Sequence, residues 1–101
     1  MSTLEKITFT GKFPLGQLLM TRGVNNRVAK DIVFAKFVFQ SLRRHASGDW
    51  GECGKEDWQE NEFSLDKRLR LFSVYKAGQV KIWIITEADR SATTVLFPEE
   101  Y

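Results

Sequence analysis

The stretch that decides the fold is residues 69–97, which read LRLFSVYKAGQVKIWIITEADRSATTVLF. Two segments within it, residues 69–76 and 80–86, are rich in Val, Ile, Tyr and Trp, and a short Lys-Ala-Gly-Gln connection separates them. Such residues favour strands, and a short connection that contains glycine is typical of a β-hairpin. A polar turn at 87–91 then leads into a third predicted strand at 92–97. This stretch therefore predicts three consecutive antiparallel strands.

Two helices are predicted upstream of these strands. Along residues 31–46, side chains recur with the spacing of one helical face, and that face comprises Phe34, Phe37, Val38, Ser41, Leu42 and His45. A shorter helix is predicted over residues 55–66, with acidic residues near its start and Lys67 just past its end. Residues 15–21 indicate a first short strand, and a turn follows at 23–26.

These elements predict one α+β domain over residues 1–101, in which residues 1–14 are irregular or form a weak edge strand. The predicted order is β-α-α-β-β-β, an antiparallel sheet of about four strands with two helices packed on one face. A chain of 101 residues with 43% hydrophobic composition is large enough to bury one core.

The composition also narrows the cellular setting. Cys53 is the single cysteine, whereas small secreted domains usually carry several paired ones. Residues 1–12 contain no apolar stretch of the signal-peptide kind, and no apolar run in the sequence is long enough to span a bilayer. We therefore expect a cytoplasmic protein that does not associate with membranes.

Charge is distributed unevenly along the chain. Residues 1–47 hold eight Lys and Arg against two acidic residues, whereas residues 48–101 hold seven against eleven. This distribution indicates a molecule with a basic side and an acidic side, unless folding brings the halves together to neutralise each other. The candidate phosphate-binding residues of the basic half are Arg22, Arg27, Lys36, Arg43 and Arg44. They would make the chain a nucleic-acid-binding accessory protein, although a solvated helix face would carry the same residues.

A glycine-rich loop at residues 48–54 contains Trp50 among polar residues. This tryptophan either packs into the core, which is the commoner case, or anchors a partner, because Trp is enriched among interface hot spots. Acidic residues continue from the loop into the second predicted helix. Together with the charged turn at 87–91, they give the candidate partner-binding residues Asp49, Trp50, Glu52, Glu56, Glu60, Asp89 and Arg90.

Residues with catalytic chemistry are few and dispersed. His45 is the only histidine, so the serine and threonines at 91–94 have no plausible base for a hydrolase triad. His45, Asp49, Glu52 and Cys53 lie close in the sequence, but without a paired Cys or His motif they are weak evidence for a metal site. We expect no catalytic residue, no metal and no cofactor.

A small metal-dependent nuclease is the enzymatic alternative. Asp89 lies in a charged turn, and folding could bring Lys81 and either Asp49 or Asp57 beside it to hold Mg²⁺. The competing interpretation is an ordinary turn, because Asp bonds its own backbone in turns and Arg readily pairs with a nearby carboxylate.

Four segments occur in a distinctive combination, namely LMTRGV at 19–24, SLRRH at 41–45, SGDWG at 47–51 and KIWIITEADRSATTVLFPEEY at 81–101. With them the chain resembles an uncharacterised bacterial family of short plasmid- and mobile-element-related proteins, found mostly in Gram-positive bacteria. Its members are often labelled plasmid-related proteins or type I restriction subunits. The chain lacks the length and the Asn/Asp-Pro-Pro-aromatic motif that a methyltransferase subunit needs.

The resemblance implies a mobile genetic element, where small proteins often bind and block host defences. From it and from the residues we expect a non-enzymatic protein-binding module whose partner is a protein of the bacterial host. Its concrete form would be an anti-defence inhibitor of the anti-restriction or anti-CRISPR type. The nucleic-acid-binding accessory protein and the small metal-dependent nuclease are the alternatives.

Overall fold

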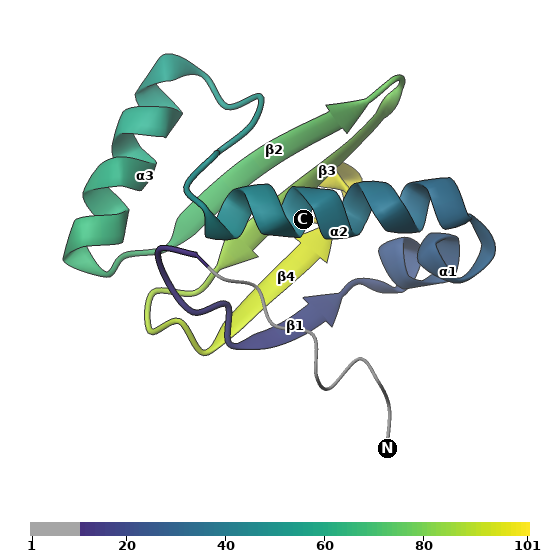
Figure 1. Ribbon diagram of the computed structural model, residues 1–101, viewed down its shortest axis with the longest axis horizontal. Helices are drawn as coiled ribbons and strands as arrows, with labels where there is room; N and C mark the ends of the chain where they lie inside the picture. Colours follow the sequence, from purple (N-terminus) through teal and green to yellow (C-terminus); the bar gives the residue numbers. More distant parts are fainter. Residues whose placement is uncertain (1–10) are drawn as a thin grey trace.

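The computed structural model describes residues 11–101, so the expectations for residues 1–10 lie outside the described part. It has the α+β architecture that the sequence predicts (Figure 1). The elements in chain order are β1 (Gln17–Met20), α1 (Arg22–Lys30), α2 (Ile32–Ala46), α3 (Lys55–Lys67), β2 (Leu71–Ala77), β3 (Val80–Thr86), β4 (Ala92–Leu96) and the 3-10 helix η2 (Pro98–Glu100).

The four strands form one mixed sheet in the order β1-β4-β3-β2. The predicted antiparallel pairing is confirmed for β2 with β3 and for β3 with β4. It is wrong for β1, which lies parallel to β4 with Leu18 opposite Thr93. The direction of β1 depends on a partner more than 70 residues away in the chain, and nothing in its own few residues specifies that direction.

A third helix, α1, replaces the turn predicted at 23–26. Thr21 caps this helix by accepting a hydrogen bond from the Val24 N–H at 3.5 Å. The Glu100 carboxylate also accepts from the Thr21 hydroxyl at 2.6 Å and from the Gly23 N–H at 3.0 Å. These bonds, the one from Thr21 above all, hold the pKa of Glu100 below its usual value. A carboxylate at a helix N-terminus stabilises the helix, and this one comes from the other end of the described chain.

The long helix predicted at 31–46 is confirmed as α2. Asp31 caps it by accepting from the Val33 N–H at 3.0 Å and the Phe34 N–H at 3.1 Å. Its predicted apolar face is buried, with Val38 and Leu42 at 1% and 3% exposure. The helix ends at Ala46, after which Gly48 adopts the left-handed conformation that glycine favours.

In the view of Figure 1, α2 passes across one face of the sheet, α1 lies beside the end of β1, and α3 stands near the start of β2. Side chains alternate between the faces of a strand, so the contacts of α2 identify its side. Ser73 and Thr86 contact His45 of α2 and therefore mark the inner face. The outer face carries the alternate residues, which include Phe72, Val74, Trp83, Ile85 and Thr94.

A chain of hydrogen bonds crosses the core between α2 and the sheet. The imidazole of His45 is fully buried, with Nδ1 2.5 Å from the Ser73 hydroxyl and Nε2 2.8 Å from the Thr86 hydroxyl. Thr86 lies 2.7 Å from the hydroxyl of Thr93, which donates to the Leu15 carbonyl at 2.7 Å. Three strands, a helix and the segment before β1 are thus joined through polar groups that have partners throughout.

The last bond of this chain fixes the direction of the others. A carbonyl only accepts hydrogen bonds, so the single hydroxyl proton of Thr93 is donated to the Leu15 carbonyl. The Thr93 oxygen must therefore accept from the Thr86 hydroxyl. Thr86 then accepts from Nε2–H of His45, and Nδ1 accepts from Ser73. His45 is therefore the neutral Nε2–H tautomer, and burial, with a smaller contribution from the charge of Arg90, lowers its pKa to about 3.

This burial predicts a pH dependence of stability. The imidazole takes up a proton near pH 6.5 in the unfolded chain but stays neutral to about pH 3 in the folded one. Acidification therefore favours unfolding, and the free energy of unfolding should fall by about 1.4 kcal/mol per pH unit below pH 6. Urea denaturation between pH 6 and 5 checks this, because carboxylates titrate mostly below that window.

His45 is the only histidine, so His45→Gln should remove that slope. Ser73→Ala is the matched control, because it weakens the same chain of hydrogen bonds but keeps the imidazole. It should lower stability at every pH and preserve the slope. An equal slope in His45→Gln would contradict the neutral buried imidazole.

Candidate interaction surface

Trp50 is buried, with no exposed side-chain area, which is the commoner of the two cases expected for it, so the alternative of an exposed partner anchor is wrong. Its ring stacks on Phe13 at a centroid distance of 6.1 Å and meets the edge of His45 at 5.6 Å. Its indole Nε1–H donates to the Glu62 carboxylate at 2.8 Å. This burial has a physical reason: the loop pairs with β2 through the Trp50 carbonyl, which accepts from the Val74 N–H at 3.2 Å, and this places the indole inside the core.

The loop and α3 together protect the edge of β2. Besides the Trp50–Val74 bond, the Glu52 N–H donates to the Val74 carbonyl at 2.7 Å. The side-chain amide of Asn61 donates to the Phe72 carbonyl at 2.6 Å and accepts from the Phe72 N–H at 3.0 Å, as a neighbouring strand would. An exposed strand edge invites pairing with another chain, and these contacts occupy it. The loop therefore has a structural role.

Asp49 and Arg44 pair with each other. The guanidinium donates to both carboxylate oxygens, at 2.8 and 3.2 Å, and lies over the ring of Tyr75 at 4.9 Å. The Arg44 hydrogen bond, with a further one from Gly51 N–H, holds the pKa of Asp49 below its usual value. Both side chains are more than 40% exposed, so the pair contributes little stability, but any partner must compete with it for either residue.

Arg90 is engaged in holding the β3–β4 turn to the end of α3 and is not a free contact residue. Its guanidinium donates to the carbonyls of Leu69 at 2.6 Å and Ser64 at 3.1 Å, and its backbone has a positive φ of 62°. Asp89 accepts a hydrogen bond from the Ser91 N–H at 3.0 Å. Asp89 therefore bonds the backbone of its own turn, as the competing interpretation of this residue predicts. Hydrogen bonds from Ser91, above all from its side chain and then from its backbone N–H, lower the pKa of the Asp89 carboxyl.

The sequence cluster of His45, Asp49, Glu52 and Cys53 does not assemble into a metal site in the described part of the chain. Among residues 11–101 no group of three His, Cys, Asp or Glu side chains converges on a point. His45 is committed to hydroxyl groups in the core, and the Cys53 thiol, whose pKa is raised by burial, donates to the Phe72 carbonyl at 3.5 Å.

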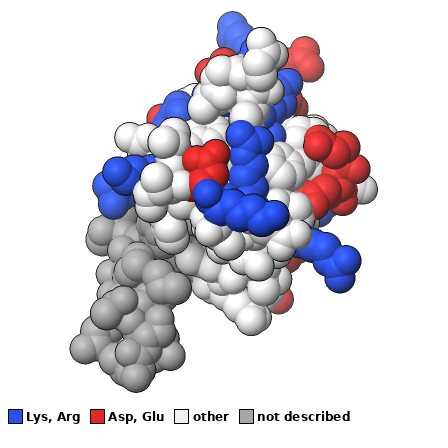
Figure 2. Space-filling model, turned by 90° about the vertical axis from the view of Figure 1, so that its right-hand side faces the viewer, with Lys and Arg blue, Asp and Glu red and all other residues white. Residues whose placement is uncertain are grey.

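The remaining candidate residues lie on the surface. Arg22, Lys36 and Arg43 are exposed, and Arg27 lies over the ring of Phe34 and 3.8 Å from Asp31. On the side of the molecule that carries α1, Lys and Arg side chains alternate with Asp and Glu instead of forming a continuous basic area (Figure 2). The acidic residues Glu52, Glu56 and Glu60 are also exposed.

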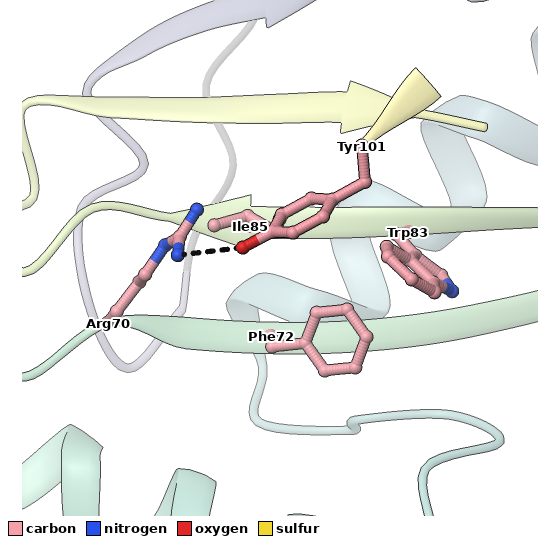
Figure 3. Close-up of a pocket in the computed structure, with 5 residues that line it drawn as sticks. All are labelled: Arg70, Phe72, Trp83, Ile85 and Tyr101. Carbon is pink, nitrogen blue, oxygen red and sulfur yellow. Dashed lines mark hydrogen bonds between the residues drawn. The ribbon is translucent and has the colours of Figure 1, made fainter. Parts of the chain in front are cut away.

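The outer face of the sheet holds a hollow that the sequence did not single out. It has a volume of about 290 Å³ and is lined by Arg70, Phe72, Trp83, Ile85 and Tyr101. Phe72 stands directly opposite Ile85 in the β2–β3 register, and Trp83 lies two residues before Ile85 on the same face. In Figure 3 the three aromatic rings stand around the hollow, with the guanidinium of Arg70 at one end.

Trp83 packs edge to face against both of the other aromatic rings of the hollow. Trp83 lies 5.1 Å from Phe72 at an interplanar angle of 80°, and 5.6 Å from Tyr101 at 65°. Arg70 donates to the Tyr101 hydroxyl at 3.3 Å, and its Nε lies 3.9 Å from a Glu87 oxygen. Tyr101 is 70% exposed, so one wall of the hollow faces solvent.

One signal for this surface was available in the sequence. Lys81, Trp83 and Ile85 alternate along β3 away from the buried Ile82 and Ile84, which indicates a second apolar face. Arg70 and Tyr101 come from segments on either side of β3 in sequence, and only the folded sheet brings them to Trp83.

Comparison with protein-family models, with curated proteins and with solved structures found no match to this chain. Within the described residues, no helix combines the length and the apolar composition that crossing a bilayer requires.

The Arg90 clamp, meaning the hydrogen bonds from its guanidinium to the Leu69 and Ser64 carbonyls, can be tested by a substitution that keeps the positive charge. Arg90→Lys loses the planar fork that reaches several carbonyls, so the free energy of unfolding should fall by about 1–2 kcal/mol. Arg43→Lys, at an exposed helical position, is the control and should change stability by less than about 0.5 kcal/mol. Equal stabilities in urea denaturation would show that the clamp is unimportant.

Proposed function

We propose that this protein is a non-enzymatic protein-binding module whose outer sheet face receives an anchor side chain from a protein of the bacterial host. The observation that carries the proposal is the convergence of Arg70, Trp83 and Tyr101 on one hollow. Tryptophan, tyrosine and arginine are the residue types most enriched among interface hot spots. Here all three border a partly open apolar depression.

The shape of the hollow favours a protein partner over a small ligand. A volume of about 290 Å³ lies at the lower limit of small-molecule sites, and one wall is the largely exposed Tyr101. The edge-to-face rings leave a depression for one inserted side chain and present no broad flat surface for stacking. An apolar side chain placed there would be covered by Phe72, Trp83 and Ile85.

The resemblance to mobile-element proteins supports a host target, and an anti-defence inhibitor of the anti-restriction or anti-CRISPR type is the concrete form of the proposal. Inhibition by surface contact needs no catalytic group. It needs a rigid scaffold, which the hydrogen-bonded core supplies, and a surface with concentrated binding energy.

A second contact region of the same module lies on α3. Glu56, Glu60 and Phe63 follow one another at helical spacing on its outward side, and Phe63 is 53% exposed. Glu52 is exposed in the loop before the helix. Of the partner-binding residues expected from the sequence, Glu52, Glu56 and Glu60 would thus act around Phe63, with Trp50 supporting the loop from the core.

The binding surface is tested by truncating the most exposed wall of the hollow. Tyr101→Ala should abolish capture of the host protein from a lysate, since loss of a hot-spot residue weakens binding by a factor of about thirty or more. Val33→Ala removes an equally exposed apolar side chain from α2 and should leave capture intact.

Thermal unfolding of both variants shows whether each is folded. If folded Tyr101→Ala captures the same protein as strongly as the unaltered chain does, the outer sheet face is not the binding surface.

A further inference from the structure

Two lysines face each other beside the hollow. Lys76 of β2 and Lys81 of β3 are directly opposite in the antiparallel register, and both are exposed. Lys81 lies on the same face as Trp83, two residues along the strand and therefore about 7 Å away. Like charges in directly opposite positions destabilise a hairpin, so the free protein carries an electrostatic cost at this point.

Within residues 11–101 no carboxylate approaches either ammonium to ion-pair distance. Two acidic residues border this region: Glu87 lies beside Arg70 at the opposite end of the hollow, and Glu99 lines a neighbouring depression together with Lys81 and Arg27, where the two cations outnumber it. The end of the face beyond Trp83 therefore presents positive charge to a binding partner.

We infer that the partner segment bound on the outer sheet face is acidic, with carboxylates that meet Lys76 and Lys81 and an apolar or aromatic side chain that enters the hollow. This inference rests on the proposed function and adds the chemistry of the partner. An anion between the lysines would remove their mutual repulsion on binding, so the same contact gains attraction and relieves a cost.

A single-stranded nucleic acid is also anionic, but the face suits it less well. Nucleic-acid strands bind where rings offer flat surfaces for successive bases, whereas Phe72, Trp83 and Tyr101 meet edge to face. Glu87 and Glu99 would also lie along the path of a continuous phosphate backbone. A peptide can place its charges selectively, opposite the lysines and away from these carboxylates.

The test uses polymers of defined charge and side-chain content as probes. A random copolymer of glutamate and tyrosine supplies both features, polyglutamate supplies the charge alone, and a copolymer of lysine and tyrosine supplies the rings with the opposite charge. The chain should bind the glutamate–tyrosine copolymer most tightly, measured by fluorescence anisotropy at low salt. Physiological salt should weaken that binding several-fold, because exposed charges are screened over about 8 Å.

Paired variants separate the two lysines from net charge. Lys76→Gln combined with Lys81→Gln should weaken binding of the glutamate–tyrosine copolymer by about tenfold. Lys30→Gln combined with Lys67→Gln makes the same change in net charge at the ends of α1 and α3, and binding should stay within about twofold. Circular dichroism and thermal unfolding confirm that both double variants are folded.

The inference is overturned if the lysine–tyrosine copolymer binds as tightly, or if the Lys76/Lys81 variant binds like its control. Tighter binding of oligothymidylate than of the glutamate–tyrosine copolymer would overturn it in favour of a nucleic acid. These failures are distinct from failure of the proposed function, which Tyr101→Ala and the captured host protein decide. If the host protein is lost with Tyr101→Ala but binds the double-lysine variant normally, the proposed binding module stands. Only the inference that its partner segment is acidic is then overturned.

Discussion

The hydrogen-bonded chain through His45 is the constraint on which the arrangement of the layers depends. Each donor and each acceptor in it has a partner of matching character, from Ser73 through His45, Thr86 and Thr93 to the Leu15 carbonyl. Burying an imidazole without partners would cost several kcal/mol, so an alternative packing of α2 would have to find equivalent partners. The inner face of the sheet offers two hydroxyl groups at the right positions, whereas the neighbours of Ser73 and Thr86 on the outer face include the apolar Phe72, Val74 and Ile85. The chain thereby specifies which face the helix covers.

The proposed binding surface follows from that choice. With α2 held on the inner face, the apolar side chains of the outer face depend on η2 and Tyr101 for cover. That cover is partial, because Tyr101 itself is largely exposed while Ile85 beneath the hollow is nearly buried. A protein partner would complete the burial and gain about 25 cal/mol for each Å² of apolar surface removed from water. The edge of β2 is less suited to this role, since the loop before α3 and the Asn61 amide already occupy the backbone groups of Val74 and Phe72.

The parts of this fold that were predictable are those decided by neighbouring residues. Strand-forming residues around a short turn predict the β2–β3 hairpin, and apolar residues at helical spacing predict α2. Asp31 caps α2 through N–H groups only two and three residues away. The parts that were not predictable depend on distant partners. Glu100 caps α1 from more than 70 residues away, and the direction of β1 is set by β4. A scan for local patterns cannot register either contact.

The same difference between local and long-range contacts explains why Trp50, and not Trp83, attracted attention in the sequence. Trp50 was conspicuous because glycines surround it, but backbone pairing with Val74 draws it into the core. Trp83 was inconspicuous because it lies in an apolar strand, and its partial exposure follows from which face α2 leaves open. Exposure depends on how the layers pack, so local sequence drew attention to Trp50 and could not identify Trp83 as the tryptophan of the outer face.

The three tryptophans report this assignment independently, because each has a separate indole N–H signal. A soluble paramagnetic agent broadens the NMR signals of N–H groups that solvent can reach, and measuring all three in one spectrum compares them directly. Trp83, which is partly exposed, should be broadened more than Trp50, which is fully buried and donates to Glu62, and more than Trp58, which is partly exposed but donates to the Gly51 carbonyl. A broadened Trp50 beside a protected Trp83 would contradict the account and return the binding surface to the glycine-rich loop.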